Sequence, residues 1–120
     1  MKPVSQYLQE NLKPSFSDLL LSLMRDKNLN PSEVYKKALM DRKLFSKIIS
    51  VPNYKPSKKN VCALVLALEL DSKTSKQLIK RAGYILTSGS KFDLMIRYCI
   101  ENKIYDLYKV ESLLREINEI

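Results

Sequence analysis

The residues best suited to chemistry in this sequence are basic, and they are concentrated in the second quarter of the chain. Residues 31–60 hold eight lysines and arginines against only Glu33 and Asp41, so this segment supplies most of the net charge of +8. A lysine that binds a phosphate releases a counterion, which favours a surface for polyanions. The same charges are compatible with an ordinary solvated surface. The eight residues are Lys36, Lys37, Arg42, Lys43, Lys47, Lys55, Lys58 and Lys59.

The rest of the composition gives little support to catalysis. The chain has no histidine, which removes the commonest general base and the commonest metal ligand. A Ser-His-Asp triad, a Cys-His pair and a histidine zinc site are therefore excluded, and two cysteines cannot form a four-thiolate site. The two glycines, Gly83 and Gly89, do not form a phosphate-binding loop. We expect no enzyme activity, no metal and no cofactor.

Length and composition predict one globular domain over residues 1–120, since 45% of the residues are hydrophobic and 28% are charged. The longest uncharged apolar run, 61–68, is far shorter than the roughly 20 residues of a membrane span. The first residues lack the apolar stretch of a secretory signal, and the two cysteines have no motif spacing. We therefore expect a cytoplasmic protein that does not bind membranes, with Cys62 and Cys99 as unpaired core residues.

Apolar residues recur at helical spacing along most of the chain, and no segment alternates as a strand would. The pattern predicts an all-α fold, a compact bundle of about six to seven short helices. Residues 1–14 form an N-terminal arm or short helix (4–12), 16–83 form a core, and 90–118 form a C-terminal helical pair. The almost wholly apolar segment 58–70 is expected to be the central buried helix. The predicted helices are 16–27, 31–39, 42–50, 58–70, 73–82, 91–102 and 107–118.

Side chains that cap helix N-termini precede these segments. Asp18 and Asp93 follow two of the caps at the spacing of a capping box, and Pro31 suits the first position of its helix. Gly83 is placed to end the helix before it, because a residue after a helix often adopts positive φ. The expected N-caps are Ser15, Asn30, Asp41, Ser57, Asp71 or Ser72, Ser90 and Asp106.

Residues 16–83 contain, in this order, a short helix capped by Asn30, a turn near residues 39–40 and a second short helix capped by Asp41. This order resembles the helix-turn-helix of the Cro/phage-repressor (XRE) family. The resemblance makes 41–48 the recognition helix, whose Phe45-Ser46-Lys47-Ile48 matches the family's apolar-Ser-basic-apolar run. It implies a DNA-binding regulator of transcription from a bacterium or phage. The family's fourth helix is matched at Pro56, Ser57, Val61, Leu64, Ala67 and Leu68.

The sequence departs from that family at three positions. Pro31 replaces a glutamine that reaches DNA, and Tyr35 stands where the family has a small residue. Leu39 occupies the turn position of a glycine, and a leucine resists positive φ. We therefore expect a wider turn than the family's, which leaves open whether the following helix still enters a groove.

A second resemblance covers more of the chain. It is to a small helical module of Gram-positive bacteria that stands alone or trails larger proteins such as macrodomain proteins, and it implies a module carried for interaction. The segments that resemble this module are 33–38, 41–48, 54–58, 82–84 and 91–93.

Two functions follow, and the sequence leaves both open. In the first, Arg42 and Lys43 read guanine edges of duplex DNA, with Ser46 and Lys47 one turn further along. Apolar stripes of 91–102 and 107–118 then supply either a homodimer interface or plain core packing. The expected phosphate contacts are Lys36, Lys37, Asn53, Tyr54, Lys55, Lys58 and Lys59.

In the second function the same basic surface binds an acidic protein, as an adaptor or inhibitor would. The low arginine content favours this alternative, since base-reading surfaces use arginine more than lysine. The five arginines are Arg25, Arg42, Arg81, Arg97 and Arg115.

Overall fold

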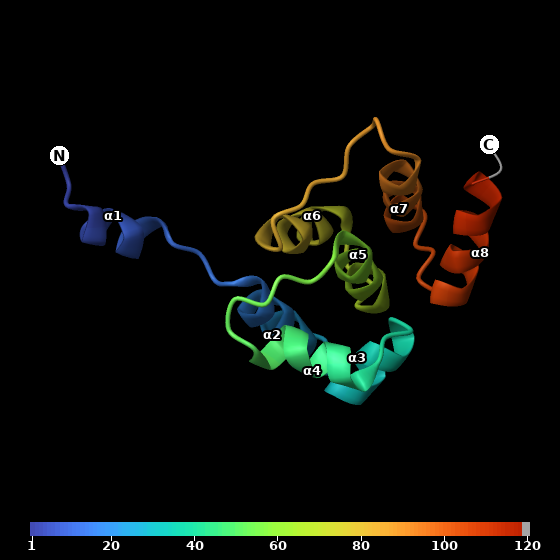
Figure 1. Cartoon of the computed structure of the whole chain (residues 1–120), viewed down its shortest axis with the longest axis horizontal. Coiled ribbons are helices and arrows are strands. Elements are labelled where there is room, and N and C mark those ends of the chain that lie inside the picture. Colours follow the sequence, from blue (N-terminus) through green and yellow to red (C-terminus); the bar gives the residue numbers. More distant parts are fainter. Residues whose placement is uncertain (119–120) are drawn as a thin grey trace.

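Helices make up all the regular structure in residues 1–118, the part of the chain that the computed structural model describes (Figure 1). No strand occurs in these residues, which confirms the predicted all-α class. Seven of the helices form a compact bundle, and α1 stands apart from it (Figure 1). The elements are α1 (Val4–Asn11), α2 (Phe16–Asp26), α3 (Pro31–Lys37), α4 (Arg42–Ser50), α5 (Lys58–Ala67), α6 (Ser72–Arg81), α7 (Lys91–Glu101) and α8 (Leu107–Ile117).

The seven helices of the bundle begin at the caps that the sequence predicts. Each cap side chain accepts a hydrogen bond from a backbone N–H in the first turn. That N–H has no acceptor within the helix, so the cap supplies its missing partner. At α3 the cap is a full capping box, because Glu33 also accepts from the backbone N–H of Asn30. For α6 the choice between two candidates falls on Asp71. The caps are Ser15, Asn30, Asp41, Ser57, Asp71, Ser90 and Asp106.

Helix ends differ from the predicted ones because the chain reverses at residues other than glycine. Leu39, Glu69 and Lys103 all have positive φ, between 51° and 55°, directly after helices α3, α5 and α7. The segment predicted as 58–70 therefore ends at Ala67, and that predicted as 31–39 ends at Lys37. The expected wide turn at Leu39 is wrong. The N–H of Met40 donates to the carbonyl of Tyr35 at 2.8 Å, which closes a tight left-handed helix ending.

All seven helices from α2 through α8 share one hydrophobic core, and α5 lies at its centre as expected. Six of the ten residues of α5 are buried, and the helix packs against α3, α6, α7 and α8. On the other side of the bundle, α2 packs against α4 and α6. Both cysteines, Cys62 and Cys99, are free and buried, as predicted.

The apolar stripes of α7 and α8 are used in this same core. Met95, Ile96, Cys99 and Val110 are buried, and the rest of the stripe packs against them. These side chains are therefore occupied within the chain itself, which favours core packing, the second of the two alternatives, over a homodimer interface there. No helix among residues 1–118 is long and apolar enough to cross a membrane.

Candidate nucleic-acid interface

The outer face of α4 presents the basic residues that the sequence singles out. Phe45 and Ile48 are buried against the bundle, so helical spacing turns the residues between them outward. Arg42, Lys43, Ser46 and Lys47 are all exposed. Because they are spaced at i, i+1, i+4 and i+5, they lie on one face over two successive turns. We call these four residues the α4 face.

The α4 face is held by packing beneath it and is not covered from above. α4 packs against α2 and α3, whereas α7 and α8 pack against α5, on the other side of the bundle (Figure 1). The rings of Tyr35 and Phe45 lie 6.0 Å apart, which ties α3 to α4 behind the face. Asp41 accepts from the N–H of Lys43 and fixes the first turn. The face is therefore a rigid, open helix surface.

The cations of the α4 face have no acidic partner within residues 1–118. Arg42, Lys43 and Lys47 make no ion pair there, and neither does the neighbouring Lys36 of α3. Lys37, by contrast, lies 3.5 Å from Glu69 at the end of α5. The positive charge of α4 is thus left free for a ligand.

The loop between α4 and α5 turns its residues to different sides. Asn53 is exposed and adopts positive φ, as turn residues of this type tolerate. Tyr54 is half-buried and packs against the core, so its ring is only partly available. The ammonium of Lys55 lies 4.9 Å from the centre of the Tyr84 ring, beyond α6, in a cation–π contact.

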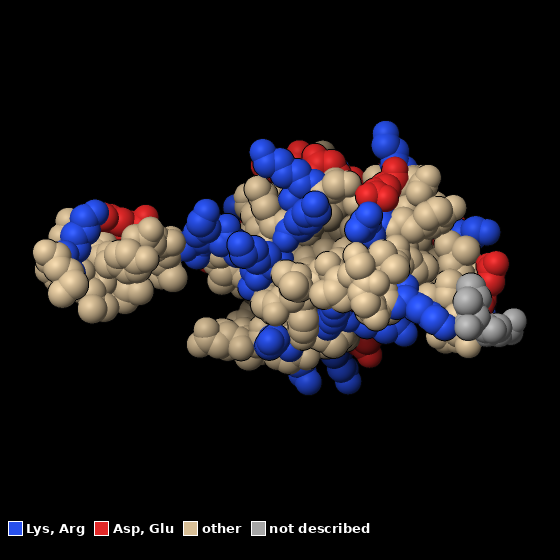
Figure 2. All heavy atoms as spheres, turned by 90° about the horizontal axis from the view of Figure 1, so that it is seen from above, with Lys and Arg blue, Asp and Glu red and all other residues tan. Residues whose placement is uncertain are grey.

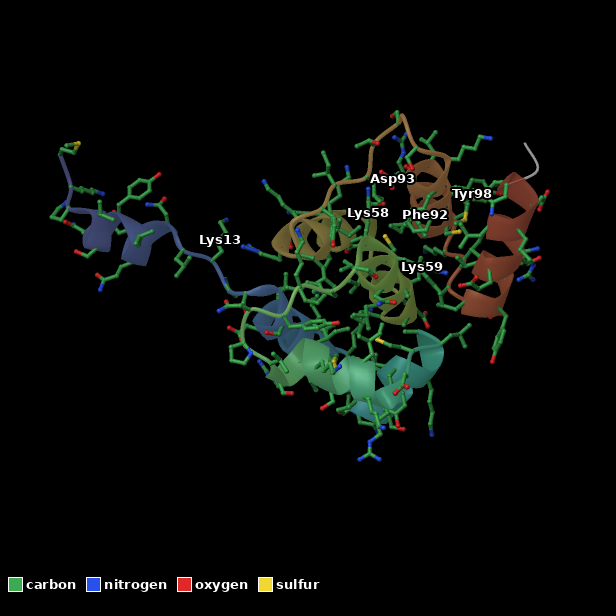
Figure 3. All side chains as sticks on the ribbon, viewed as in Figure 1. Lys13, Lys58, Lys59, Phe92, Asp93 and Tyr98 are labelled. Carbon is green, nitrogen blue, oxygen red and sulfur yellow. The ribbon has the colours of Figure 1, made fainter. Side chains whose placement is uncertain are left out.

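Lys58 has a structural partner that the sequence pattern did not reveal. Its Nζ donates to Oδ2 of Asp93 at 2.7 Å, where α5 and α7 begin (Figure 3). The Asp93 side chain is 2% exposed and also accepts from the N–H of Thr87 at 2.8 Å. Burial raises the pKa of Asp93, but hydrogen bonds from Lys58 and Thr87 outweigh burial and hold the pKa below its usual value. Withdrawing Lys58 would leave a buried carboxylate uncompensated, so its expected role at phosphates is unfavourable.

The capping box expected at Ser90 is only half formed for the same reason. Ser90 accepts from the N–H of Asp93, but the Asp93 carboxylate bonds to Lys58 and Thr87. The next residue, Lys59, lies 3.8 Å from Glu111 of α8, and both side chains are largely exposed. The eleven predicted site residues thus divide into the open α4 face, the exposed Lys36 and Asn53 that precede and follow α4 in the chain, and five residues that contact other parts of the bundle. The five are Lys37, Tyr54, Lys55, Lys58 and Lys59.

A second basic surface, along α6, was missed by sequence reasoning. This helix has four cations and no acidic residue, a signal present in segment 72–81 but masked by the larger excess in 31–60. Figure 2 shows many basic side chains on the side of the bundle that holds α6 and α7. The four cations of α6 are Lys73, Lys76, Lys80 and Arg81.

The two thiols and the acidic groups offer no further reactive centre. Burial raises the pKa of the Cys62 thiol to about 12 and also raises that of Cys99, so both stay protonated at neutral pH. Within the described residues, no three His, Cys, Asp or Glu side chains gather as a metal site would require.

Comparison of the chain with protein-family models, curated proteins and solved structures gave no match, so it is assigned to no family.

Proposed function

We propose that this chain binds double-stranded DNA by placing the α4 face in the major groove. The observation that supports this most is that Arg42, Lys43 and Lys47 share one open helix surface and have no acidic partner among residues 1–118. Arginine and lysine bind the O6 and N7 atoms of guanine, and a serine hydroxyl bonds to several bases. In this arrangement Arg42 and Lys43 contact bases first, and Ser46 and Lys47 follow one turn later.

The neighbouring residues would hold the phosphates. Lys36 lies close to the α3–α4 turn and makes no ion pair with any residue that the structure describes, and Asn53 is exposed just after α4. Lys37 is in an exposed ion pair with Glu69, which contributes little and exchanges readily for a phosphate. Lys59 pairs with Glu111 of α8 and is left out of the proposed site. Lys58 is left out of the proposed site because of Asp93. The tight ending at Leu39 supports the proposal, because it keeps the connection between α3 and α4 short.

The resemblance to the XRE family suggests the same helix, and with it a regulator acting in the bacterial cytoplasm. This chain lacks the glutamine with which the family contacts DNA, since Pro31 stands at that position. Base contacts would then come from α4 alone, with phosphate contacts supplying most of the affinity.

A direct test is fluorescence anisotropy of a labelled duplex titrated with the protein at several salt concentrations. With about four phosphate contacts, affinity should fall roughly 100-fold between 50 and 200 mM salt. The variant R42E/K43E/K47E should lose binding while keeping its helical circular dichroism spectrum. The control K91E/K103E/K109E has the same net charge change on α7, α8 and the loop between them, and it should still bind. Equal losses in both variants would show a non-specific charge effect and contradict the proposal.

The second candidate is binding of an acidic protein surface by the same α4 face. The division of the predicted basic surface favours it, because within the described part of the chain the cations near α4 without an ion pair are those of α4 itself and Lys36. Such a protein would ignore duplex DNA at 50 mM salt. It would instead retain a defined partner that R42E/K43E/K47E releases and K91E/K103E/K109E does not.

A further inference from the structure

The helix α6 carries positive charge that no acidic residue interrupts. Residues 72–90 hold Lys73, Lys76, Lys80 and Arg81 and contain no aspartate or glutamate. Lys73, Lys76 and Lys80 are exposed, and their spacing of i, i+3 and i+7 places them on one side of the helix over two turns. Arg81 is half-buried and is not counted with them. We call the three lysines the α6 face.

The cations of the α6 face are not neutralised by the fold. None of the three lysines makes an ion pair among residues 1–118. Asp71, just before the helix, is its N-cap and accepts from a backbone N–H in the first turn at 2.7 Å. Glu101, which lies across the hollow between α6 and α7, is already 3.5 Å from Arg97. The charge of the α6 face is therefore open to a ligand, as that of the α4 face is.

The composition of the α6 face suits a row of phosphates better than a protein partner. The exposed residues of α6 are all polar, whereas protein–protein interfaces are depleted in lysine and have apolar and aromatic side chains at their centre. With a rise of 1.5 Å per residue, the three lysines span about 10 Å, the axial length of about three phosphates on one DNA strand. Contacts to phosphates carry no sequence information. The exposed residues of α6 are Ser72, Lys73, Lys76, Gln77 and Lys80.

The α6 face and the α4 face lie on different sides of the body. α2 packs against both helices, and α2 and α5 lie between α4 and α6 (Figure 1). The buried sides of the two helices, at Leu78 and Ile79 of α6 and at Phe45 and Ile48 of α4, belong to the same core. The two sets of cations therefore point away from each other. A straight duplex against one face does not reach the other, and wrapping would require a bend that costs elastic energy.

We infer that the α6 face binds the phosphate backbone of a second duplex, so that one chain bridges two DNA duplexes. The bridge depends on the proposed function, because the α4 face holds the first duplex. Three phosphate contacts form a weak site, so the α6 face by itself does not retain a short duplex. Chains bound along a long duplex present many α6 faces together, and their combined contacts hold the second duplex.

Capture on beads tests the bridge. A biotinylated duplex of about 200 base pairs is immobilised, saturated with protein at 50 mM salt and then offered a fluorescent duplex of the same sequence. The wild type should retain the fluorescent duplex, and K73E/K76E/K80E should retain at least about tenfold less. The neutral variant K73Q/K76Q/K80Q should show a smaller loss. The matched control K91E/K103E/K109E reverses three exposed lysines on α7, α8 and the loop between them and should retain as much as the wild type.

The anisotropy titration with one short duplex separates the two surfaces. K73E/K76E/K80E should bind that duplex as well as K91E/K103E/K109E does, because the α4 face is unchanged. A larger loss would mean that α4 and α6 form one site, and the bridge would be wrong. A wild type that binds the short duplex but retains no fluorescent one would also overturn the bridge. The α4 proposal would then stand, and the α6 face would be left for an acidic protein. A wild type that binds no duplex would contradict both proposals.

Sedimentation equilibrium without DNA distinguishes the bridge from self-association. The wild type should be a monomer at the concentration used for capture, since one chain carries both faces. A dimer that K73E/K76E/K80E dissociates would instead attribute the capture to two chains that each hold one duplex, and it would overturn bridging by a single chain.

Discussion

Lys43 on α4 and Lys58 at the start of α5 carry the same charge in the same basic segment, yet they lie in opposite environments. Lys43 is exposed and has no acidic partner within residues 1–118. Lys58 is 30% exposed and holds the buried carboxylate of Asp93. A charge whose partner is buried stabilises the fold, whereas an unpaired charge on a rigid helix is available to a ligand. The burial of the partner, rather than the charge itself, separates structural from functional cations here.

Replacing Lys58 and Lys43 in turn should give the largest difference in the free energy of unfolding. Lys58→Met leaves Asp93 charged, buried and without its cation, which should lower the free energy of unfolding by about 3 kcal/mol. Lys43→Met removes an exposed charge and should change that free energy by no more than about 0.5 kcal/mol. Urea unfolding followed by circular dichroism measures both. The double variant K58M/D93N should recover part of the loss, and equal stabilities of the two single variants would refute the distinction.

The ion pair between Lys58 of α5 and Asp93 of α7 should also make the stability of the fold depend on pH. The pKa of Asp93 in the folded chain lies below its usual value of 3.8, so the ionised form stabilises the fold. That contribution is complete above the usual pKa and is lost as the pH falls through the lowered one. The stability difference between the wild type and Asp93→Asn should therefore be largest near neutral pH and shrink below pH 3.8. Unfolding curves at pH 7, 5, 4 and 3 measure it, and a constant difference would contradict this assignment.

Much of the fold could be predicted from sequence because helix starts are local. Asn30 and Ser57 mark the starts of α3 and α5, because each cap side chain bonds to the backbone N–H three residues further along the chain. Helix ends were less predictable, since Leu39 and Glu69 take a conformation that usually requires glycine. No local signal marks these two positions, because neither leucine nor glutamate is a residue type that favours positive φ.

The candidate site was predictable to the same extent. The spacing of Phe45 and Ile48 determines which residues of α4 face outward, so the α4 face follows from the sequence. The role of Lys58 does not, because Asp93 is 35 positions away and its spacing from Ser90 matches an ordinary capping box. Long-range pairing of this kind appears only when α5 and α7 are placed side by side.

The turn that carries the α4 face should be easier to stabilise than the end of α6. Leu39 and Gly83 both follow a helix with positive φ, but only Gly83 avoids the steric cost of a side chain. Leu39→Gly should raise the free energy of unfolding by up to about 1 kcal/mol, and Gly83→Ala should lower it by a similar amount. Urea midpoints check both. A destabilised Leu39→Gly would mean that the leucine side chain contributes packing that outweighs its strain.

The smallest expected effect concerns Lys59, which lies beside Lys58 but pairs with an exposed partner. Because its contact with Glu111 is 3.8 Å long and both groups reach solvent, Lys59→Gln should change stability by less than about 0.5 kcal/mol. Lys47→Gln should be equally mild for stability. In DNA binding the two should differ, since Lys47→Gln should reduce the slope of log affinity against log salt by about 1 and Lys59→Gln by much less. Equal reductions would mean that the DNA-binding surface extends from α4 across the start of α5. The pair between Lys58 and the buried Asp93 would then be a structural support of the site.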